Sequence, residues 1–431
     1  MKKLIANYRA RAQQEVSARH VDILDGVRVL AIFIVAWFHI WQQSWLRPYI
    51  YDEATSTTHL NLEPLVRSGF VMVDVMLLIS GFLLFLPYAR RMIEGGPRPN
   101  VKGFYLKRAL RILPSYWLCI AIMLFAFALP ERDFVMDARL WKDLWTHLTF
   151  THVFFYETYI ATELNVVLWT LAIEVQFYLI FPLIARLFSK RPLVTWFVMV
   201  AAAFAFRDLM VRPQSDTNLW VNQLPTFLDV YANGMLAALC YVHLSRTLKH
   251  TRWTRLASTA LAFVMLFLIW QQVKIYSSSG AYAMQMRIDW HEAIRIFQAR
   301  YRFQFSIYAS IFILAAANAG LAFRFFFSSR MMRVLAAVSF QYYIWHQFLA
   351  AKMRSDWRFP PSVAQNPNEV GEQPWQWLFT LCAFGFPLIL SLILTYGFER
   401  PIAKLGWGLW TKRKERKARE KYVVSKGGLD A

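Results

Sequence analysis

The sequence predicts an all-α, polytopic membrane protein with about ten transmembrane helices and both termini in the cytoplasm. Hydrophobic residues make up 57% of the 431 residues and charged residues only 17%, whereas about a quarter of the residues of a soluble protein are charged. Apolar runs long enough to cross a bilayer recur along the whole chain. Lys and Arg concentrate in alternate connecting segments, as the positive-inside rule requires. Because this bias accounts for the net charge of +21, we expect the basic segments to contact anionic lipid and expect no nucleic-acid partner.

One membrane domain, residues 26–401, is predicted between two basic segments. Residues 1–25 are polar and basic and contain neither a short apolar region nor a cleavage site, so we expect a cytoplasmic segment and a retained signal-anchor. Residues 402–431 are crowded with Lys and Arg, and we expect a cytoplasmic, partly disordered tail. The ten helices are expected at about 25–46, 67–88, 112–129, 166–188, 192–210, 225–243, 256–272, 304–321, 334–354 and 376–400.

The cysteines and the longest connecting segments restrict the chemistry further. Cys119, Cys240 and Cys382 all lie in apolar runs, so we expect neither a disulfide framework nor a metal site. The segment 131–165 is rich in Trp, His and Thr and suits an outer cap with interfacial aromatic residues. We expect this segment and the loop 273–303 to shape the choice of an external ligand.

A single stretch, Asp25–His39, combines an apolar helix with two ionisable side chains that are unfavourable in lipid. It reads DGVRVLAIFIVAWFH, and Arg28 and His39 are eleven residues apart within it. Eleven residues are about three helical turns, so the two side chains share one helix face and are separated by roughly 16 Å of rise. Ionisable side chains are unfavourable in lipid, so we expect both to face the protein interior.

Three other predicted helices carry an ionisable residue at the depth of His39. Counted from the outer helix ends, all four lie roughly 10–12 Å deep, and the other three are Asp74, Glu174 and His346. A second, basic set is expected at the cytoplasmic face and consists of Arg28, Lys107, Arg108 and Arg111.

Each of these residues also has a structural interpretation. A lone histidine on a membrane helix is often a hydrogen-bonding residue between helices, and pairing with a neighbouring helix is the favoured role for Asp74. Lys107, Arg108 and Arg111 would snorkel to the cytoplasmic surface in most membrane proteins. The shared depth of the four ionisable residues favours a functional interpretation.

The chemistry that these groups suit is acyl transfer across the membrane. A neutral histidine removes a proton from a hydroxyl at ordinary pH, and a nearby carboxylate orients it. Arginine binds phosphate in a bidentate, charge-assisted manner. A cytoplasmic polyphosphate donor and an outer hydroxyl acceptor that meet inside the bundle describe transfer from an acyl-CoA.

Four motifs, in order along the chain, carry a family resemblance. They read LDGVRVLAIFIVAWFH, VDVMLLISGFLLF, FYLKRALRILPSYW and LWTLAIEVQFYLIFP. Later segments FLDVYANGMLAA, SFQYYIWHQF and FERP extend the match over nearly all of residues 20–402. The chain resembles the acyltransferase-three family of integral membrane acyltransferases, which acylate sugars of bacterial surface glycans and related acceptors. Val27 stands where leucine is usual, and Lys107–Arg108–Ala109 is a variant of a double-arginine pattern, which leaves the exact phosphate ligands open.

The resemblance implies a function and a set of site residues. It implies an O-acyltransferase of the bacterial inner membrane that uses acetyl-CoA as a donor substrate, with no permanently bound cofactor and a carbohydrate or glycolipid acceptor. The implied catalytic residues are His39 as base, Glu174 and Arg28. The implied donor-binding residues are Arg108, Arg111, Lys107 and Tyr116. The implied pocket residues are Asp74, Ser80, Trp169, Tyr178 and His346.

Several alternatives stay open at this stage. An acyl-histidine intermediate competes with direct transfer, and the acceptor, the acyl length and the oligomeric state are not identified. Some relatives carry a hydrolase-like domain after the last helix; here a basic tail follows, so we expect the stand-alone form. A transporter or flippase would also place charges inside the membrane, although no internal repeat of the kind common in transporters is evident. A non-catalytic assembly subunit is the third candidate.

Overall fold

The computed structural model describes residues 21–427 except residues 22, 53–56, 96–97 and 212–216. Most of the predicted N-terminal segment 1–25 and the last residues of the tail therefore lie outside the described residues. The chain is 82% helical with almost no strand, which confirms the predicted all-α class.

Within the residues that the structure describes, ten long helices build the body of the protein, and each corresponds to one of the ten predicted helices. They are α2 (Ile23–Ser44), α4 (Met72–Glu94), α5 (Val101–Met123), α8 (Trp169–Lys190), α9 (Pro192–Phe206), α10 (Leu228–Thr247), α11 (Arg252–Ser277), α13 (Trp290–Asn318), α15 (Arg330–Ser355) and α16 (Trp375–Leu394). Shorter elements connect or follow them: β1 (Tyr49–Asp52), β2 (Thr57–Asn61), α3 (Glu63–Arg67), α6 (Ala138–Leu148), α7 (Tyr156–Tyr159), α12 (Ser279–Met286), α14 (Leu321–Phe327) and α17 (Arg400–Gly427).

The number of helices able to span a membrane is smaller than the predicted number of about ten. Within the described residues, eight helices are long and apolar enough, and a ninth span is added if the bent pair of α13 and α15 is counted as one. Polar residues such as Arg302 in α13 and His346 in α15 lower the apolar character of these two helices. The protein is a multi-pass membrane protein.

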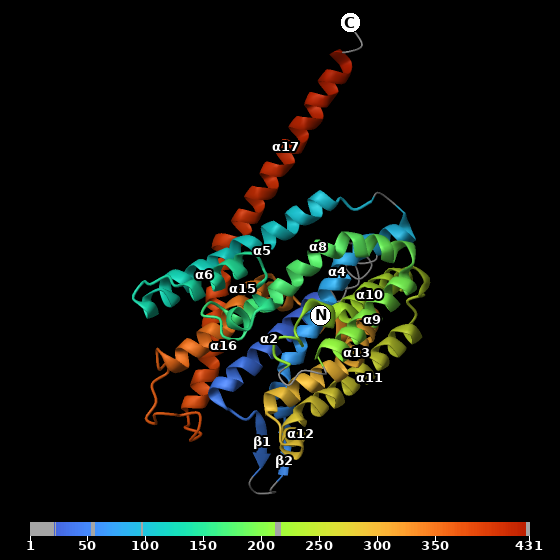
Figure 1. Cartoon of the computed structure of the whole chain (residues 1–431). Coiled ribbons are helices and arrows are strands. Elements are labelled where there is room, and N and C mark those ends of the chain that lie inside the picture. The colour runs from blue at the N-terminus through green and yellow to red at the C-terminus, as the bar shows by residue number, and fades with distance from the viewer. Residues whose placement is uncertain (1–20, 22, 53–56, 96–97, 212–216, 428–431) are drawn as a thin grey trace.

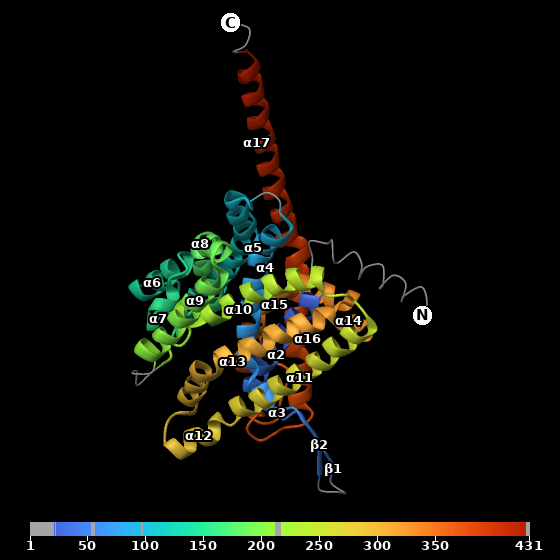
Figure 2. The ribbon, with the colours of Figure 1, turned by 90° about the vertical axis from the view of Figure 1, so that its right-hand side faces the viewer.

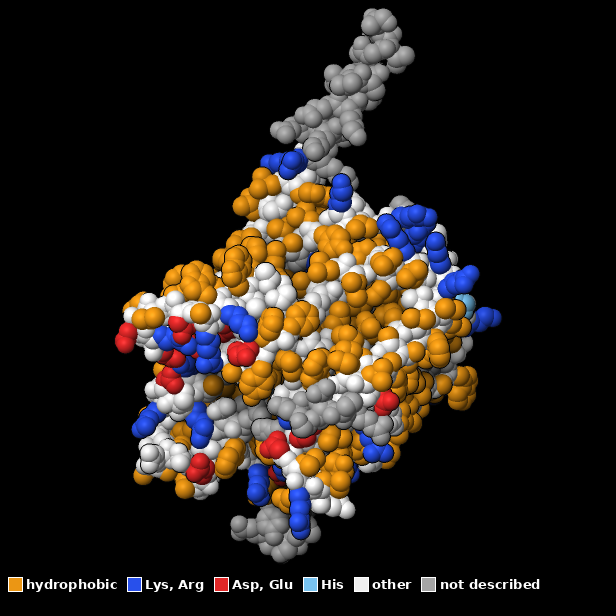
Figure 3. All heavy atoms as spheres, in the orientation of Figure 1, with side chains coloured by type: hydrophobic (Ala, Val, Ile, Leu, Met, Phe, Trp, Pro, Cys, Tyr) orange, Lys and Arg blue, Asp and Glu red, His pale blue; other side chains and the backbone are white. Residues whose placement is uncertain are grey.

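The two ends of the bundle differ in shape (Figure 1). α17 leaves one end, and the antiparallel hairpin of β1 and β2 leaves the opposite end; we call them the α17 end and the hairpin end. Hydrophobic side chains cover the middle of the face seen in Figure 3, and charged side chains gather above and below this band. This distribution matches a bilayer around the middle of the bundle.

α2 and α4 lie at the centre of the bundle, where α2 packs against α15 and α4 packs against α10. The contact between α4 and α10 is close because two glycines face the partner backbone. A Cβ atom on Gly81 would lie 2.7 Å from the carbonyl oxygen of Tyr231, and one on Gly234 would lie 2.2 Å from that of Leu78. Small residues permit this approach between membrane helices. On the side turned to the viewer in Figure 2, α11 and α13 lie side by side.

Three predicted connecting segments are more ordered than the sequence suggests. The basic motif at Lys107–Arg111 lies inside α5 rather than before the third helix, since α5 begins at Val101. The eighth helix begins at Trp290, not near 304, and α12 precedes it. The tail forms the helix α17 as far as Gly427, so the expectation of partial disorder is wrong for its described part.

The segment 131–165 forms a compact cap made of α6, α7 and the short helix η4 (His152–Phe154). His147 and His152 stack inside it with ring centroids 3.9 Å apart, and both side chains are buried. Nδ1 of His147 lies 3.0 Å from the Asp143 carboxylate. The Tyr116 hydroxyl of α5 donates to the carbonyl oxygen of His147 at 2.9 Å, so Tyr116 anchors the cap.

Acidification is expected to loosen the cap. Burial, reinforced by the neighbouring His147, holds the pKa of His152 well below its usual value of 6.5. Below about pH 6.5 the unfolded chain therefore binds a proton that the folded cap excludes, and the free energy of unfolding falls by up to about 1.4 kcal/mol per pH unit. Thermal unfolding at pH 7.5 and 5.5 checks this, with a smaller loss expected for His152→Phe. Equal losses in both proteins would assign the acid sensitivity to other groups.

Candidate functional site

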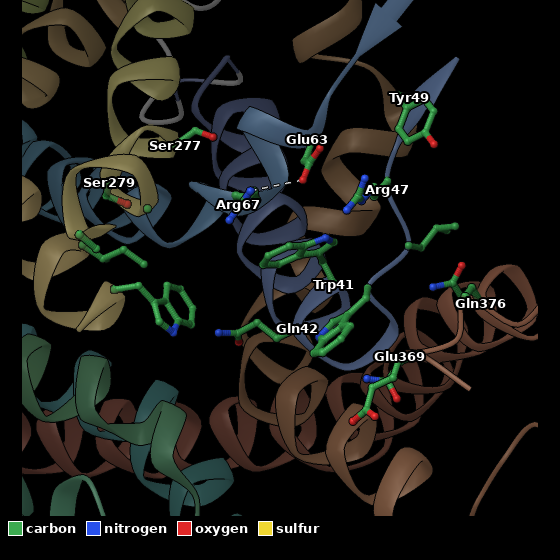
Figure 4. Close-up of a pocket in the computed structure, with 18 of the residues that line it drawn as sticks. Trp41, Gln42, Arg47, Tyr49, Glu63, Arg67, Ser277, Ser279, Glu369 and Gln376 are labelled. Carbon is green, nitrogen blue, oxygen red and sulfur yellow. Dashed lines mark hydrogen bonds and ion pairs between the residues drawn. The ribbon is translucent and has the colours of Figure 1, made fainter. Parts of the chain in front are cut away.

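A large cavity of about 1470 Å³ opens at the hairpin end of the bundle; we call it the vestibule (Figure 4). Its walls come from the end of α2 and the chain beyond it, from α3, from α12 and the start of α13, and from residues 368–377. Among the described residues that line it, none comes from the segment 131–165. The vestibule is thus lined by part of the segment 273–303 and by residues 368–377.

The vestibule combines aromatic faces with hydrogen-bonding groups. The Arg67 guanidinium lies 5.5 Å from the ring centroid of Trp41 and 3.4 Å from the Glu63 carboxylate. Other aromatic and polar lining residues are Trp45, Tyr49, Trp290, Trp377, Gln42, Arg47, Glu369, Gln373 and Gln376. Aromatic faces offer flat apolar surface, and amides, carboxylates and guanidinium groups bind hydroxyls. This lining suits a ligand with apolar faces and many hydroxyls.

A smaller cavity of about 130 Å³, which we call the inner cavity, lies deeper in the bundle. Three of the predicted site residues line it, namely His39, Asp74 and Trp169, together with Arg302 and Tyr343. Gln42 of the vestibule bonds to His39 of the inner cavity, so the walls of the two cavities are joined at this contact.

The hydrogen bonds of the two histidines define which nitrogen is available. Nδ1 of His39 lies 3.1 Å from Oε1 of Gln42; the amide oxygen accepts, so Nδ1 carries the proton and Nε2 keeps its lone pair. Nδ1 of His346 donates to the Tyr343 carbonyl oxygen at 2.7 Å. The His346 ring is fully buried, and its centroid lies 5.3 Å from that of His39. The structure thus brings both predicted histidines together, with His39 facing the inner cavity.

Gln42 is expected to act as a positioning residue for His39. Replacing it with methionine removes the acceptor that fixes the tautomer of His39, and a loss of about ten- to a hundredfold in kcat is expected, by comparison with partners that orient metal-bound histidines. Steady-state kinetics of acyl transfer measure this loss. Gln373→Met is the matched control, because Gln373 lines the same vestibule and bonds to Gln376, not to His39. An equal loss in both variants would contradict the positioning role.

Asp74 is paired with an arginine that sequence reasoning missed. Nε of Arg302, on α13, lies 3.3 Å from the Asp74 carboxylate, and Arg302 is only 1% exposed. Its Nη1 donates at 2.9 Å to the Val221 carbonyl oxygen and to the Thr226 hydroxyl. This ion pair agrees with the helix-pairing role favoured for Asp74. Arg302 was missed because the outer loop was expected to extend to residue 303.

A second buried ion pair lies next to the first and was also missed. Nη2 of Arg207 lies 2.7 Å from the Asp229 carboxylate, and both side chains are buried. Arg207 also donates to the Thr226 carbonyl oxygen, while Arg302 bonds to the hydroxyl of the same threonine. The two pairs thus join α4, α10, α13 and the turn after α9 into one charged network behind the inner cavity. Arg207 stands at the end of an apolar run, and this position was the sequence signal that could have revealed it.

Glu174 does not share the layer of His39. The Ser80 hydroxyl donates to Oε1 of Glu174 at 2.8 Å, and the Tyr178 hydroxyl donates to the same oxygen. Glu174 follows Trp169 by five residues along α8, which places it roughly 8 Å of helical rise deeper than the inner cavity. The predicted single layer is therefore wrong for this residue, because Trp169, the first residue of α8, already lies at the level of the inner cavity, so the helix ends from which the depths were counted do not lie in one plane. Glu174 is therefore not positioned to assist His39 directly.

Glu174 instead belongs with the arginines toward the α17 end. Arg28 interacts electrostatically with Glu174, Arg108 and Arg111. The Arg108 guanidinium lies 5.5 Å from the ring centroid of Tyr178, and its buried Nε has no hydrogen-bond partner within the described part of the chain. We call these five residues, Arg28, Arg108, Arg111, Glu174 and Tyr178, the arginine cluster.

Two residues of the predicted donor set lie elsewhere. The Lys107 ammonium lies 4.8 Å from the Trp407 ring centroid on α17 and is exposed. Tyr116 is fully buried under the cap, where its ring stacks on Phe150 at 4.4 Å. Tyr116 was misplaced because five residues of helix separate it from Arg111, which is roughly 8 Å of rise.

The long apolar helices define an integral membrane protein. The family model described as an acyltransferase domain matches residues 21–396, and the chain belongs to this family, which confirms the resemblance seen in the sequence motifs. Residues 21–396 therefore form a membrane-embedded domain of this acyltransferase family.

Three relatives illustrate the range of similar proteins. The chain is 26% identical over 251 residues to Nodulation protein 10 of Rhizobium leguminosarum bv. viciae, covering 54% of this chain and 63% of the relative. It is 27% identical to a putative acetyltransferase of Acidianus two-tailed virus, covering 57% and 62%. It is 25% identical to the peptidoglycan O-acetyltransferase OatA of Listeria monocytogenes, covering 40% and 25%. The chain thus spans less than two thirds of the length of each of these relatives. No solved structure matches it significantly.

Proposed function

We propose that this protein transfers an acetyl group from acetyl-CoA to a hydroxyl of a glycan or glycolipid. In this proposal the α17 end is cytoplasmic, the hairpin end faces outward, and the membrane is the bacterial inner membrane. The observation that carries the proposal is the hydrogen bond between Gln42 and His39, because it joins His39, the proposed base, to the walls of both the vestibule and the inner cavity. Family membership and the O-acetyltransferase names among the relatives support the reaction type.

The arginine cluster is the proposed phosphate site of the donor. Guanidinium groups suit the diphosphate and the 3′-phosphate of CoA. Arg28 lies on the same helix face as His39 and roughly 16 Å from it along α2, so the pantetheine arm would extend along this face toward the inner cavity. Acetyl-CoA is consumed as a substrate, and the proposal needs no permanently bound cofactor.

The acceptor is proposed to occupy the vestibule, with one hydroxyl directed to His39. Nε2 of His39 takes the hydroxyl proton while the acceptor oxygen attacks the thioester carbonyl carbon. The C–S bond then breaks, the CoA thiolate leaves, and the imidazolium returns its proton to the thiolate. The products are an O-acetyl ester and free CoA. If His39 attacks the thioester itself, the same atoms transfer through an acyl-histidine.

The sizes of the cavities support a short acyl group. The inner cavity, at about 130 Å³, is less than a tenth of the vestibule volume of about 1470 Å³. A two-carbon acyl group fits a space of this size, whereas a long acyl chain would need to displace packed side chains, which is costly in a close-packed interior.

The test uses purified full-length protein in nanodiscs with acetyl-CoA labelled in the acetyl group and a panel of oligosaccharides. Release of CoA together with alkali-labile label on an oligosaccharide is the expected result. Proteoliposomes that move an oligosaccharide without consuming acetyl-CoA would overturn the proposal in favour of a transporter.

A further inference from the structure

A third cavity, of about 490 Å³, lies at the α17 end and belongs neither to the vestibule nor to the arginine cluster. Its lining residues are Arg330, Arg333, Val334 and Ala337 of α15, Tyr396 of the π-helix η8 (Thr395–Glu399), and Arg400 of α17. Three guanidinium groups thus converge from two separate segments of the chain. We call this cavity the triple-arginine cavity.

The positive charge of this cavity is not balanced by its own walls. No carboxylate is among the described residues that line it, and within the described part of the chain the guanidinium groups of the three arginines form neither a hydrogen bond nor an ion pair. Arg400 lies over the Tyr396 ring at 4.5 Å from the centroid. The neighbouring Glu399 accepts a hydrogen bond from Gln341 at 3.1 Å and interacts with both Arg111 and Arg400. Three like charges at one cavity favour binding of an anion.

An apolar stripe leads from this cavity toward the middle of the membrane. Ile389, Leu392 and Tyr396 follow one another at helical spacing on one face of α16 and η8, and they are 57%, 37% and 46% exposed. Val334, in the wall of the cavity, is 41% exposed. In a membrane protein such side chains contact lipid acyl chains. The cavity and the stripe together match a ligand with an anionic head and apolar chains.

We propose that the triple-arginine cavity binds the phosphate headgroup of an anionic phospholipid in the leaflet at the α17 end. The phosphate oxygens accept hydrogen bonds from Arg330, Arg333 and Arg400, since guanidinium groups bind phosphate in a bidentate manner. The acyl chains lie along the stripe Ile389–Tyr396. Basic pockets between membrane helices on the cytoplasmic side are typical sites for such headgroups.

The bound lipid would hold together the helices that carry the catalytic groups. Gln341 of α15 bonds to Glu399 and also donates to the Ser115 hydroxyl of α5 at 2.6 Å. Neutralising the three arginines therefore stabilises the junction of α15, α17 and α5. α15 carries His346, and α5 carries Arg108 and Arg111.

The experiment measures retention of phosphatidylglycerol by the full-length protein, using native mass spectrometry and thermal unfolding. The test variant combines Arg330→Gln, Arg333→Gln and Arg400→Gln. The matched control combines Lys249→Gln, Arg252→Gln and Arg255→Gln, which removes the same charge from exposed positions in the connection after α10 and in the first turn of α11. Phosphatidylcholine serves as the uncharged reference lipid.

We expect phosphatidylglycerol to bind the wild type and the control with equal affinity and to bind the test variant at least about tenfold more weakly. The variant in which all three arginines become lysine should bind with intermediate affinity, because lysine keeps the charge but loses the bidentate geometry. Equal retention by test and control variants would overturn the proposal, since retention would then reflect general surface charge.

A separate measurement distinguishes a lipid from a soluble phosphate. Free CoA is added to wild type saturated with phosphatidylglycerol, and lipid retention is measured again. Retained lipid supports the proposal. Displacement of the lipid by CoA, together with loss of CoA binding in the test variant, would assign the cavity to the donor and overturn the lipid proposal. Acetyl transfer is not the readout, so failure of the proposed function would not affect this result.

Discussion

His39→Gln is expected to lower the rate of acetyl transfer by at least about a hundredfold without unfolding the protein. A positioned general base contributes roughly 10²- to 10⁴-fold to a rate, and glutamine keeps the approximate size of the side chain but cannot take up the proton. His39 lines the inner cavity and is half-buried, so little packing is lost. Initial rates of acetyl transfer from labelled acetyl-CoA measure the effect.

The matched control for this experiment is His243→Gln, since His243 is exposed near the end of α10. It should leave the rate within about twofold of the wild type. Binding of acetyl-CoA, measured separately, should be unchanged in His39→Gln because the proposed phosphate ligands are roughly 16 Å away along α2. A folded His39→Gln protein with the wild-type rate would contradict the assignment of His39 as base.

Arg302→Met is expected to destabilise the protein by about 3–5 kcal/mol, because removal of one partner leaves the buried Asp74 carboxylate without its counter-charge. Both partners are almost completely buried, with Asp74 at 4% and Arg302 at 1% exposure. Thermal or denaturant unfolding in detergent measures the loss, which should appear as a lower midpoint.

Two further variants separate the lost ion pair from other consequences of the substitution. The double variant Asp74→Leu with Arg302→Met should recover much of the stability, since replacement of a whole buried pair by apolar residues is often tolerated. Arg300→Met is the matched control on the same helix, because Arg300 is exposed, and it should change stability by less than about 0.5 kcal/mol. A double variant as unstable as Arg302→Met alone would show that the ion pair is not the cause.

Much of the helical architecture follows from local sequence. The apolar runs predicted all ten long helices, because burial in lipid requires about twenty apolar residues per span. The spacing of Arg28 and His39 predicted that they share one face of α2. In the structure Arg28 belongs to the arginine cluster and His39 lines the inner cavity. The positions of residues within a helix depend only on helical geometry, so the sequence alone specifies them.

The helix ends were less predictable, and the errors had consequences for the site. The eighth helix begins at Trp290, because the polar first turns of α13 pack against protein and need no apolar composition. That error placed Arg302 in a loop and concealed the partner of Asp74. The outer end of α8 likewise lies at the level of the inner cavity, which Trp169 lines together with His39, so Glu174 lies deeper than His39.

The partners of the polar side chains were decided by the tertiary structure. Asp74 lies 228 residues before Arg302 in the chain, and Ser80 lies 94 residues before Glu174. No local pattern links such residues, because their contact depends on which helices pack together and at what height. The vestibule wall at residues 368–377 and the triple-arginine cavity arise in the same way. Sequence periodicity therefore determined the membrane helices and the helix face on which each ionisable residue lies. The packing of helices that are distant in the sequence determined which of those residues come into contact.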